Sequence, residues 1–180
     1  MIIAISGFTG SGKTSLGDYL SAKLSNLGIK TTIIKPSFKD LAKKEGISLM
    51  EFQKKAEKDK SIDILFDKYV KEQVIKSTNP IVSTWLSVWL INADVKIFLT
   101  APIEKRARRL VKRGDFKSFL DAIEHVKARD EENRKRYLDI YSVDIYKLYE
   151  ECDITINTDK YNISEEADII IHLLKMKGLM

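Results

Sequence analysis

Cysteine, histidine and proline are all scarce in this chain of 180 residues. Its one cysteine, Cys152, excludes an internal disulfide framework, and with two histidines it is too little for a structural zinc site. These absences favour a protein of a reducing, cytoplasmic compartment. A chain of this length can bury a sufficient apolar core as one domain, without covalent staples.

Long hydrophobic runs are missing as well. The apolar start, residues 1–5, is too short for the core of a signal peptide and has no basic segment before it, so we expect no secretory leader. The longest later run, residues 81–91, contains serine and threonine and is shorter than a membrane span. We therefore expect no membrane partner.

Arginine is absent from most of the chain. All seven arginines lie within residues 106–136, here called the arginine window, whereas lysine is spread over the whole length. The net charge of +5 is typical of a solvated lysine surface, and no nucleic-acid-binding motif accompanies it, so we expect no nucleic-acid partner. Arginine is favoured where a planar guanidinium contacts phosphate or carboxylate. The window therefore indicates anion binding.

Short β-branched runs alternate with helical patterns, which predicts an α/β fold with a five-stranded parallel sheet flanked by helices. Between the second and third strands an all-helical segment is expected, in which Ser48 and Glu51 have the spacing of a capping box. The expected strands are residues 1–6, 30–35, 80–84, 95–100 and 153–158, and the expected helices are 14–26, 38–77 with a break at Gly46, 102–112, 119–137 and a last helix capped by Ser164.

Residues 7–14 read Gly-Phe-Thr-Gly-Ser-Gly-Lys-Thr, which matches the G-x-x-x-x-G-K-[ST] pattern of a phosphate-binding loop. Its glycines let successive N–H groups converge on phosphate oxygens, and the following helix points its positive end at the same anion. Lys13 is expected to reach the β- and γ-phosphates, and the Thr14 hydroxyl to bind Mg²⁺.

The context of this motif decides between a phosphate site and a glycine turn without a ligand. It follows a predicted strand and opens a predicted helix, as a phosphate loop must. We therefore expect a P-loop NTPase fold and an ATP-dependent phosphotransferase. The expected nucleotide-binding residues are Gly7, Thr9, Gly10, Ser11, Gly12, Lys13, Thr14 and Ser15.

The arginines form two sets, one on each side of a break at Gly114. Such a helix–loop–helix unit can close over a nucleotide and neutralise charge on the transferring phosphoryl group. The alternative is a solvated helix with local ion pairs at i, i+4 spacing, which we expect for about half of the arginines. The sets are Arg106, Arg109 and Arg113, and Arg129, Arg134 and Arg136; the candidate local pairs are Asp130–Arg134 and Glu132–Arg136.

With these motifs the chain resembles the nucleoside monophosphate kinases, in particular the archaeal cytidylate kinase type, over nearly its whole length. Besides the phosphate loop, the resemblance rests on residues 38–52, 106–113, 129–137 and 152–158 and on the pair Ile62-Asp63.

This resemblance implies a single kinase domain that uses ATP and Mg²⁺ on a small-molecule acceptor, as a monomer or homodimer. It also implies phosphate contacts from four arginines. The implied core is residues 1–37, 78–112 and 138–180, the helical acceptor lobe is 38–77 and the lid region is 113–137; the four arginines are Arg109, Arg113, Arg129 and Arg134.

The acceptor half departs from the family pattern. After its third strand that family usually presents an acidic residue, a glycine and an arginine, which serve the metal-bound water and the acceptor nucleotide. Residues 83–85 of this chain read Ser-Thr-Trp instead. In the acceptor lobe, Lys39 and Lys68 stand where such kinases tend to place arginine. A nucleobase edge needs placed polar partners, so the acceptor site is expected to be rebuilt.

These departures leave two candidate acceptors, a non-nucleotide metabolite and CMP, and the non-nucleotide is favoured. A non-nucleotide such as mevalonate 3-phosphate would suit a phosphomevalonate-type 5-kinase of isoprenoid biosynthesis, with Lys39 and Lys68 on its anionic groups. Asp63 or Asp67, spaced i, i+4, would be the base for its hydroxyl, unless both are simple surface residues. The alternative acceptor is CMP, with Trp85 or Trp89 stacked on the base, although tryptophan in an apolar run is usually core. A non-catalytic ATP-binding switch is a further alternative.

Overall fold

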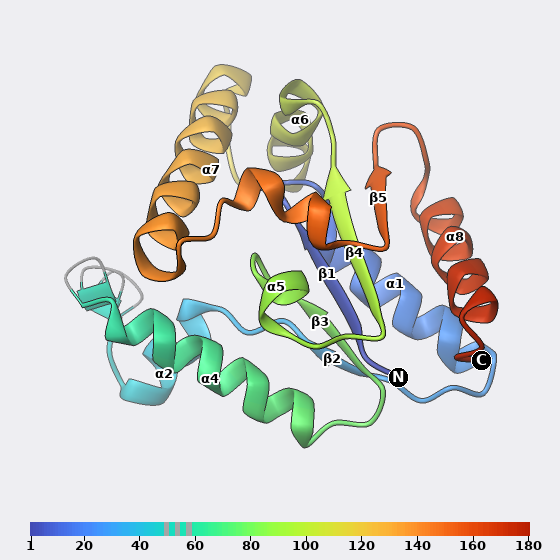
Figure 1. Cartoon of the computed structure of the whole chain (residues 1–180). Coiled ribbons are helices and arrows are strands. Elements are labelled where there is room, and N and C mark those ends of the chain that lie inside the picture. Colours follow the sequence, from blue (N-terminus) through green and yellow to red (C-terminus); the bar gives the residue numbers. More distant parts are fainter. Residues whose placement is uncertain (49–50, 53–54, 57–58) are drawn as a thin grey trace.

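Five parallel strands form one sheet with the order β2-β3-β1-β4-β5 (Figure 1). The structure is a computed structural model that describes residues 1–48, 51–52, 55–56 and 59–180, except for the side chains of residues 39, 40 and 44. The strands are β1 (Ile3–Gly7), β2 (Thr32–Ile34), β3 (Pro80–Ser83), β4 (Val95–Thr100) and β5 (Ile154–Asn157).

Helices cover both faces of this sheet, which gives three layers (Figure 1). A parallel sheet needs such cover because its strands are apolar on both sides. The helical elements are α1 (Lys13–Asn26), α2 (Phe38–Glu45), α4 (Ser61–Ile75), α5 (Ser87–Leu90), α6 (Ile103–Arg113), α7 (Phe119–Tyr141), the 3-10 helix η1 (Ile145–Glu151) and α8 (Ile163–Met176).

One face of the sheet is covered by α1 and α8. Leu16, Leu20 and Leu24 of α1 recur at i, i+4, i+8 and are fully buried against Ile3 and Ile5 of β1. Because α1 and β1 both pack in this cluster, the loop that connects them, residues 7–13, is held at both ends by the core.

The opposite face is covered by α4, α5 and η1. Val70 and Val74 of α4 pack with Val82 of β3 and Phe98 of β4 in a second buried cluster. This cluster fixes α4, and with it the acceptor lobe, beside the carboxyl end of β3. Neither α5 nor η1 was predicted from the sequence, because both are too short to show a helical period.

Helices α6 and α7 pack on each other above the carboxyl ends of the strands through a third, smaller cluster (Figure 1). Its buried members are Ala107 and Leu110 of α6 and Ala122 and Val126 of α7. The arginine window therefore lies on two helices that form one packed unit, separated by a turn in which Gly114 has the positive φ that glycine adopts easily.

The predicted strands are all present with ends shifted by one or two residues, and Val95–Thr100 agrees fully. The Ser48–Glu51 capping box is confirmed, because Glu51 N donates to Ser48 Oγ at 3.2 Å and Ser48 N donates to Glu51 Oε2 at 2.9 Å. The predicted cap of the last helix was wrong by two residues: Asn162 caps α8 and Glu165 completes the box. None of the described helices has the length and apolarity that a membrane span requires.

Candidate active site

The phosphate loop, residues 7–14, connects β1 to α1 and lies at the carboxyl edge of the sheet. Gly7 has a φ of 152°, and a Cβ there would collide with the carbonyl oxygen of Leu99 on β4. Gly10 has a φ of 73°, and its Cβ would lie 3.0 Å from the carbonyl oxygen of Arg106 on α6. The loop therefore needs glycine at these two positions, because neighbouring backbone comes too close for a side chain.

Side-chain cations hold the carbonyl groups of five consecutive loop residues. Lys13 Nζ donates to the carbonyls of Gly7 and Phe8 at 2.7 and 2.9 Å. Arg106 Nη1 donates to Thr9 O at 3.0 Å. Arg109 Nη1 lies 3.3 and 3.2 Å from the carbonyls of residues 10 and 11. Because these oxygens accept hydrogen bonds from side-chain cations, the course of the loop backbone is fixed from Gly7 to Ser11.

Polar atoms without a partner mark the loop as a ligand site. The buried hydroxyls of Thr9, Ser11 and Ser83 make no hydrogen bond within the described part of the protein. A buried hydroxyl without a partner is costly, and phosphate oxygens would satisfy these groups. The donor set of the loop therefore fits a nucleotide phosphate.

Oxygen ligands for Mg²⁺ are few on the protein side. Thr14 is the second residue of α1 and is exposed, and Ser83 is the last residue of β3. Among the described residues no three acidic, histidine or cysteine side chains gather as a metal cluster. These hydroxyls fit a metal that takes most of its ligands from phosphate and water, as Mg²⁺ does in kinases.

A cavity of about 250 Å³ opens on the outer side of the loop. It is lined by Gly12 and Ser15 at the start of α1, by Arg109, and by Tyr161 and Glu166 beside the start of α8. Burial raises the pKa of Glu166 to about 7, and the guanidinium of Arg109 opposes this shift. The cavity adjoins the phosphate loop, so it is placed to take the base or ribose of a bound nucleotide.

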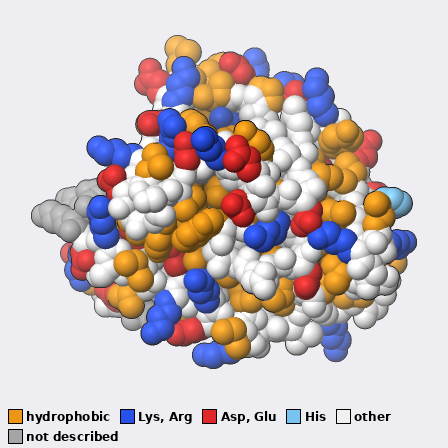
Figure 2. Space-filling model, viewed as in Figure 1, with side chains coloured by type: hydrophobic (Ala, Val, Ile, Leu, Met, Phe, Trp, Pro, Cys, Tyr) orange, Lys and Arg blue, Asp and Glu red, His pale blue; other side chains and the backbone are white. Residues whose placement is uncertain are grey.

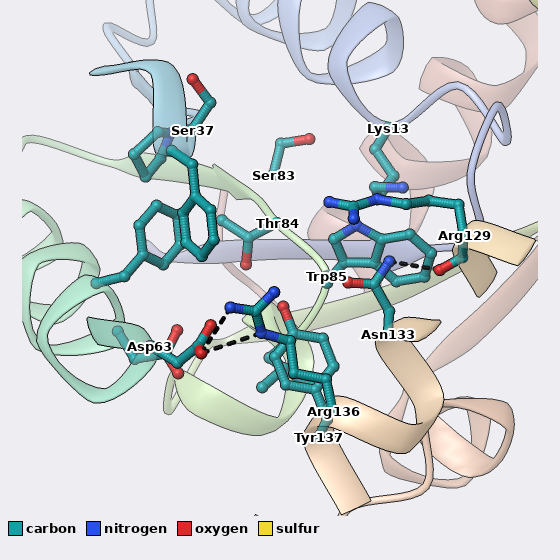
Figure 3. Close-up of a pocket in the computed structure, with 15 residues that line it drawn as sticks. Lys13, Ser37, Asp63, Ser83, Thr84, Trp85, Arg129, Asn133, Arg136 and Tyr137 are labelled. Atoms are coloured by element: carbon teal, nitrogen blue, oxygen red, sulfur yellow. Dashed lines mark hydrogen bonds and ion pairs between the residues drawn. The ribbon is translucent and has the colours of Figure 1, made fainter. Parts of the chain in front are cut away.

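A larger cavity of about 320 Å³ lies on the inner side of the loop, between the acceptor lobe and α7. Figure 3 shows Lys13 and Arg129 on one side of its lining, and the paired side chains of Asp63 and Arg136 on the other. The lining residues are Lys13, Pro36, Ser37, Phe38, Asp63, Phe66, Asp67, Ser83, Thr84, Trp85, Leu86, Arg129, Asn133, Arg136 and Tyr137.

Two buried carboxylates of α4 line this cavity. Asp63 Oδ2 accepts from Arg136 Nε at 3.0 Å, and Asp67 Oδ2 accepts from the Tyr141 hydroxyl at 2.6 Å. Burial raises the pKa of both carboxyl groups, that of Asp67 to about 6. Simple surface pairing of these two residues is therefore excluded, because each is less than 10% exposed and bonded to α7.

Lys13 and Trp85 meet at the junction of the phosphate loop and the inner cavity. Lys13 Nζ lies 4.8 Å from the centre of the Trp85 ring, within the range of a cation–π contact. Burial lowers the pKa of Lys13 to about 8, although the carboxylate of Asp130 opposes this shift. An anion bound at the loop would raise the pKa of this lysine again.

Comparison with known proteins identifies the family. The model of the cytidylate kinase-like family matches residues 2–160. The chain belongs to this family. It is 38% identical to the cytidylate kinase of Sulfurisphaera tokodaii over 94% of this chain and 93% of that protein, and 37% identical to the cytidylate kinase of Methanobrevibacter smithii over 98% and 99%. This cytidylate kinase-like protein is thus a small-molecule kinase of the nucleoside monophosphate kinase type.

Solved structures agree on the fold. The shikimate kinase of Acinetobacter baumannii superposes with a TM-score of 0.62 at 16% identity, over 99% of this chain and 95% of that one. The deoxyadenosine kinase of M. mycoides with bound dATP gives a TM-score of 0.53 at 15% identity, over 97% and 100%. At these identities the likeness shows a P-loop kinase fold, as predicted.

The predicted arginine contacts differ from residue to residue in this cytidylate kinase-like protein. Arg129 lines the inner cavity next to Lys13 (Figure 3). Arg109 lies on loop carbonyls and on Thr158, to whose Oγ1 it donates at 2.8 Å. Arg113 is exposed and pairs with Asp115, away from both cavities. Phosphate contacts from these arginines stay predictions.

The two ion pairs predicted for α7, Asp130–Arg134 and Glu132–Arg136, are wrong, although a local pair at i, i+3 joins Arg129 to Glu132 at 3.0 Å. Arg134 donates to Asp144 at 3.0 and 2.9 Å, which leaves its guanidinium outside both cavities. Arg136 pairs with Asp63 and Asp130 pairs with Arg106, so tertiary partners replace the i, i+4 partners. Spacing along one helix could not reveal these pairs, because each links α7 to another element.

Acceptor residues were identified in part. Asp63, Asp67 and Trp85 line the inner cavity, whereas Lys68 is exposed on α4 and is not among the lining residues. The side chain of Lys39 lies outside the part of the chain that the structure describes. Sequence reasoning did not assign Asn133, Arg136 or Tyr137 to the acceptor site; their i, i+3, i+4 spacing on α7 after Arg129 was the available signal.

Charged side chains elsewhere are mixed. On the face drawn in Figure 2, lysine and arginine are interspersed with acidic side chains. The same mixture extends to the described ion pairs, such as Lys35 with Asp18 at 2.7 Å. The net charge of +5 is therefore not gathered into one patch on that face.

Proposed function

We propose that this kinase transfers the γ-phosphate of MgATP to CMP. The observation that carries the proposal is the pairing of Asp63 with Arg136 in the inner cavity, on the side away from Lys13 (Figure 3). The relatives named cytidylate kinase favour this acceptor over mevalonate 3-phosphate, and they give no support to a place in isoprenoid biosynthesis.

The chemistry of that pair suits a cytosine edge. Cytosine presents an exocyclic amine, which donates, next to a ring nitrogen and a carbonyl oxygen, which accept. The Asp63 carboxylate can accept from the amine, and the Arg136 guanidinium can donate to the acceptors. Asn133, which is only 3% exposed, lies beside Arg129 on the other side of the cavity, where its amide nitrogen donates to the Arg129 carbonyl at 2.6 Å (Figure 3).

The phosphate of CMP would then face Lys13 and Arg129. Both cations lie where the inner cavity meets the phosphate loop, so they can hold the acceptor phosphate in line with the γ-phosphate of ATP. As charge spreads over the transferring group, the loop N–H groups and Lys13 stabilise it. Mg²⁺ held near Thr14 would supply charge neutralisation between the phosphates. An acceptor phosphate needs no protein base, since its oxygen is already anionic.

A smaller acceptor is a second candidate because of the segment Ser83 to Trp85. Where the family usually has an acidic residue, a glycine and an arginine, this chain carries two hydroxyls and an indole, and Trp85 lines the cavity next to Lys13. An acceptor such as mevalonate 3-phosphate would present a hydroxyl, for which Asp67, with its pKa raised to about 6, would be the base.

A coupled ADP-release assay with MgATP tests both. The acceptors are CMP, UMP, AMP, dTMP and mevalonate phosphates, and the variants are Asp63→Asn and Asp67→Asn. Fast turnover of CMP, lowered at least ~10-fold in kcat/KM by Asp63→Asn, supports the proposal. Turnover of mevalonate 3-phosphate alone would replace it with the second candidate. Tight ATP binding without transfer to any acceptor would indicate a non-catalytic switch.

A further inference from the structure

Thr9, in the middle of the phosphate loop, is held at both of its backbone polar groups by a buried ion pair. Its N–H donates to Asp130 Oδ1 at 3.0 Å, and its carbonyl accepts from Arg106 Nη1 at 3.0 Å. The same Nη1 lies 2.6 Å from Asp130 Oδ2. Arg106 is 7% exposed and Asp130 is 3% exposed, so water does not compete for these bonds.

Arg106 is itself fixed on two further sides. Its Nε donates to the carbonyl of Ala101 at 3.0 Å, at the end of β4. Its guanidinium carbon lies 5.2 Å from the centre of the Phe8 ring, next to Thr9 in the loop. The ion pair therefore connects the loop to β4, α6 and α7 at one point.

The loop needs this support more at residues 9–11 than at residues 12–14. Gly12 caps α1, and residues 13 and 14 are already helical, so the helix fixes their N–H groups. Before Gly12, the described backbone hydrogen bond within the loop is that from Ser11 N to Phe8 O, at 3.1 Å. The shape of residues 9–11 thus depends on side chains from elsewhere in the chain.

We propose that Arg106 and Asp130 are positioning residues that hold residues 9–11 of the loop in the shape that receives the γ-phosphate. They act through Thr9 and touch no phosphate themselves. Asp130 directly follows Arg129, which lines the acceptor cavity, so one helix, α7, aligns the donor loop with the acceptor site. This inference rests on the proposed use of the loop for ATP.

The test removes both charges together. In the double variant Arg106→Met/Asp130→Leu no unpaired charge stays buried, and such replacements of a buried ion pair are often neutral for stability. Titration calorimetry then compares the affinity for MgADP with that for a non-hydrolysable MgATP analogue, and thermal unfolding reports the fold. The control is Lys23→Met/Asp168→Leu, which removes a more exposed ion pair of the same length, 2.6 Å, between α1 and α8.

The double variant is expected to stay folded with a lower melting temperature, because Thr9 and Ala101 lose hydrogen-bond partners. It is expected to bind MgADP within ~3-fold of the unchanged protein, because α1 still holds the β-phosphate site. Its affinity for the MgATP analogue is expected to fall at least ~10-fold, since the γ-phosphate meets an unsupported loop. The control is expected to change neither affinity. A merely structural pair would lower the melting temperature and leave the ratio of the two affinities unchanged.

Three results would overturn the inference. A folded double variant with the unchanged ratio would show that the ion pair does not position the loop. If the double variant does not fold, Arg106→Lys replaces it, because this variant keeps the charge opposite Asp130 but loses the planar guanidinium. An unchanged ratio of the affinities for MgADP and the MgATP analogue in Arg106→Lys would also show that the ion pair does not position the loop. Unchanged protein that binds neither nucleotide overturns the proposed use of ATP and this inference with it.

Discussion

Single side chains do most of the chemistry at the phosphate loop, and Lys13 is central among them. It holds the carbonyls of Gly7 and Phe8 and lies over Trp85, where the phosphate loop borders the inner cavity. The ammonium group of Lys13 therefore has two roles: it holds the loop backbone, and it faces the phosphate that the loop binds.

Lys13→Ala is expected to lower kcat/KM for ATP at least ~100-fold, because the variant loses the cation that faces the transferring phosphate. Steady-state kinetics measure this loss, and circular dichroism and thermal unfolding check that the fold persists. Lys23→Ala, in the same helix but paired with Asp168, is the control and is expected to be fully active. Near-full activity of Lys13→Ala would contradict the mechanism.

Glu166 predicts a pH dependence of stability. Its pKa is raised by burial from 4.5 to about 7, so between these pH values the unfolded chain releases the proton before the folded one does. Folding therefore becomes less favourable as the pH rises through this range, and Glu166→Gln removes that loss. At pH 8 the free energy of unfolding of the variant is expected to be about 1–3 kcal/mol larger than that of the parent, because one pKa unit corresponds to about 1.4 kcal/mol.

Urea unfolding at pH 5 and pH 8 measures this effect. At pH 5 the two proteins are expected to be close in stability, since the carboxyl group is then largely protonated in the folded state. A difference that is equal at both pH values would mean that Glu166 ionises as an exposed glutamate does.

At the scale of elements, α6 and α7 form a unit with a small buried cluster of its own, and α7 also packs on the main core through Tyr137 and Tyr141. Their cluster of Ala107, Leu110, Ala122 and Val126 is separate from the two clusters that cover the sheet. Yet this unit carries the side chains that hold the loop and those that line the acceptor cavity. Its packing should therefore affect activity more than its size suggests.

Leu110→Ala and Leu24→Ala make a matched comparison. Both residues are buried leucines, and each substitution is expected to cost about 2–5 kcal/mol of unfolding free energy. Only Leu110 supports the α6/α7 unit, so its variant is expected to lose several times more kcat/KM at 25 °C than the Leu24 variant. Urea unfolding and steady-state kinetics on both proteins check this. Equal kcat/KM values in two variants of equal unfolding free energy would contradict the expected role of Leu110.

The elements themselves were largely predictable, and the contacts between them were not. The loop was found because its eight residues are contiguous and its chemistry is local. Arg106 lies 24 residues from Asp130, and Arg136 lies 73 residues from Asp63, so no spacing rule connects them. The sequence indicated that arginines matter in this window, but only packing decides which of them hold the backbone and which face a cavity.

At the scale of the whole molecule, the two cavities lie on opposite sides of one loop. The outer cavity is bounded by α1 and α8, and the inner one by α4 and α7. Ligands in the two cavities therefore contact different parts of the core, and each should stabilise the folded chain in its own right.

MgADP and CMP are expected to raise the melting temperature separately, and by more when both are present. At 100 times the dissociation constant a ligand adds about 2.7 kcal/mol, which for a protein of this size corresponds to about 5–10 °C. Thermal unfolding with each ligand and with the pair measures the shifts. A shift with MgADP and none with CMP would exclude CMP as the acceptor while leaving the donor site in place.

The carbonyl groups of the phosphate loop are held by cations from α1 and α6, and Thr158 beyond β5 also donates to one of them. The shape of the loop thus depends on residues outside the motif. A chimera that transplants residues 1–30 onto a foreign sheet would inherit the glycines, the lysine and the helix, but not Arg106, Arg109 or Thr158. Such a graft is expected to bind a triphosphate poorly until those distant donors are transplanted with it.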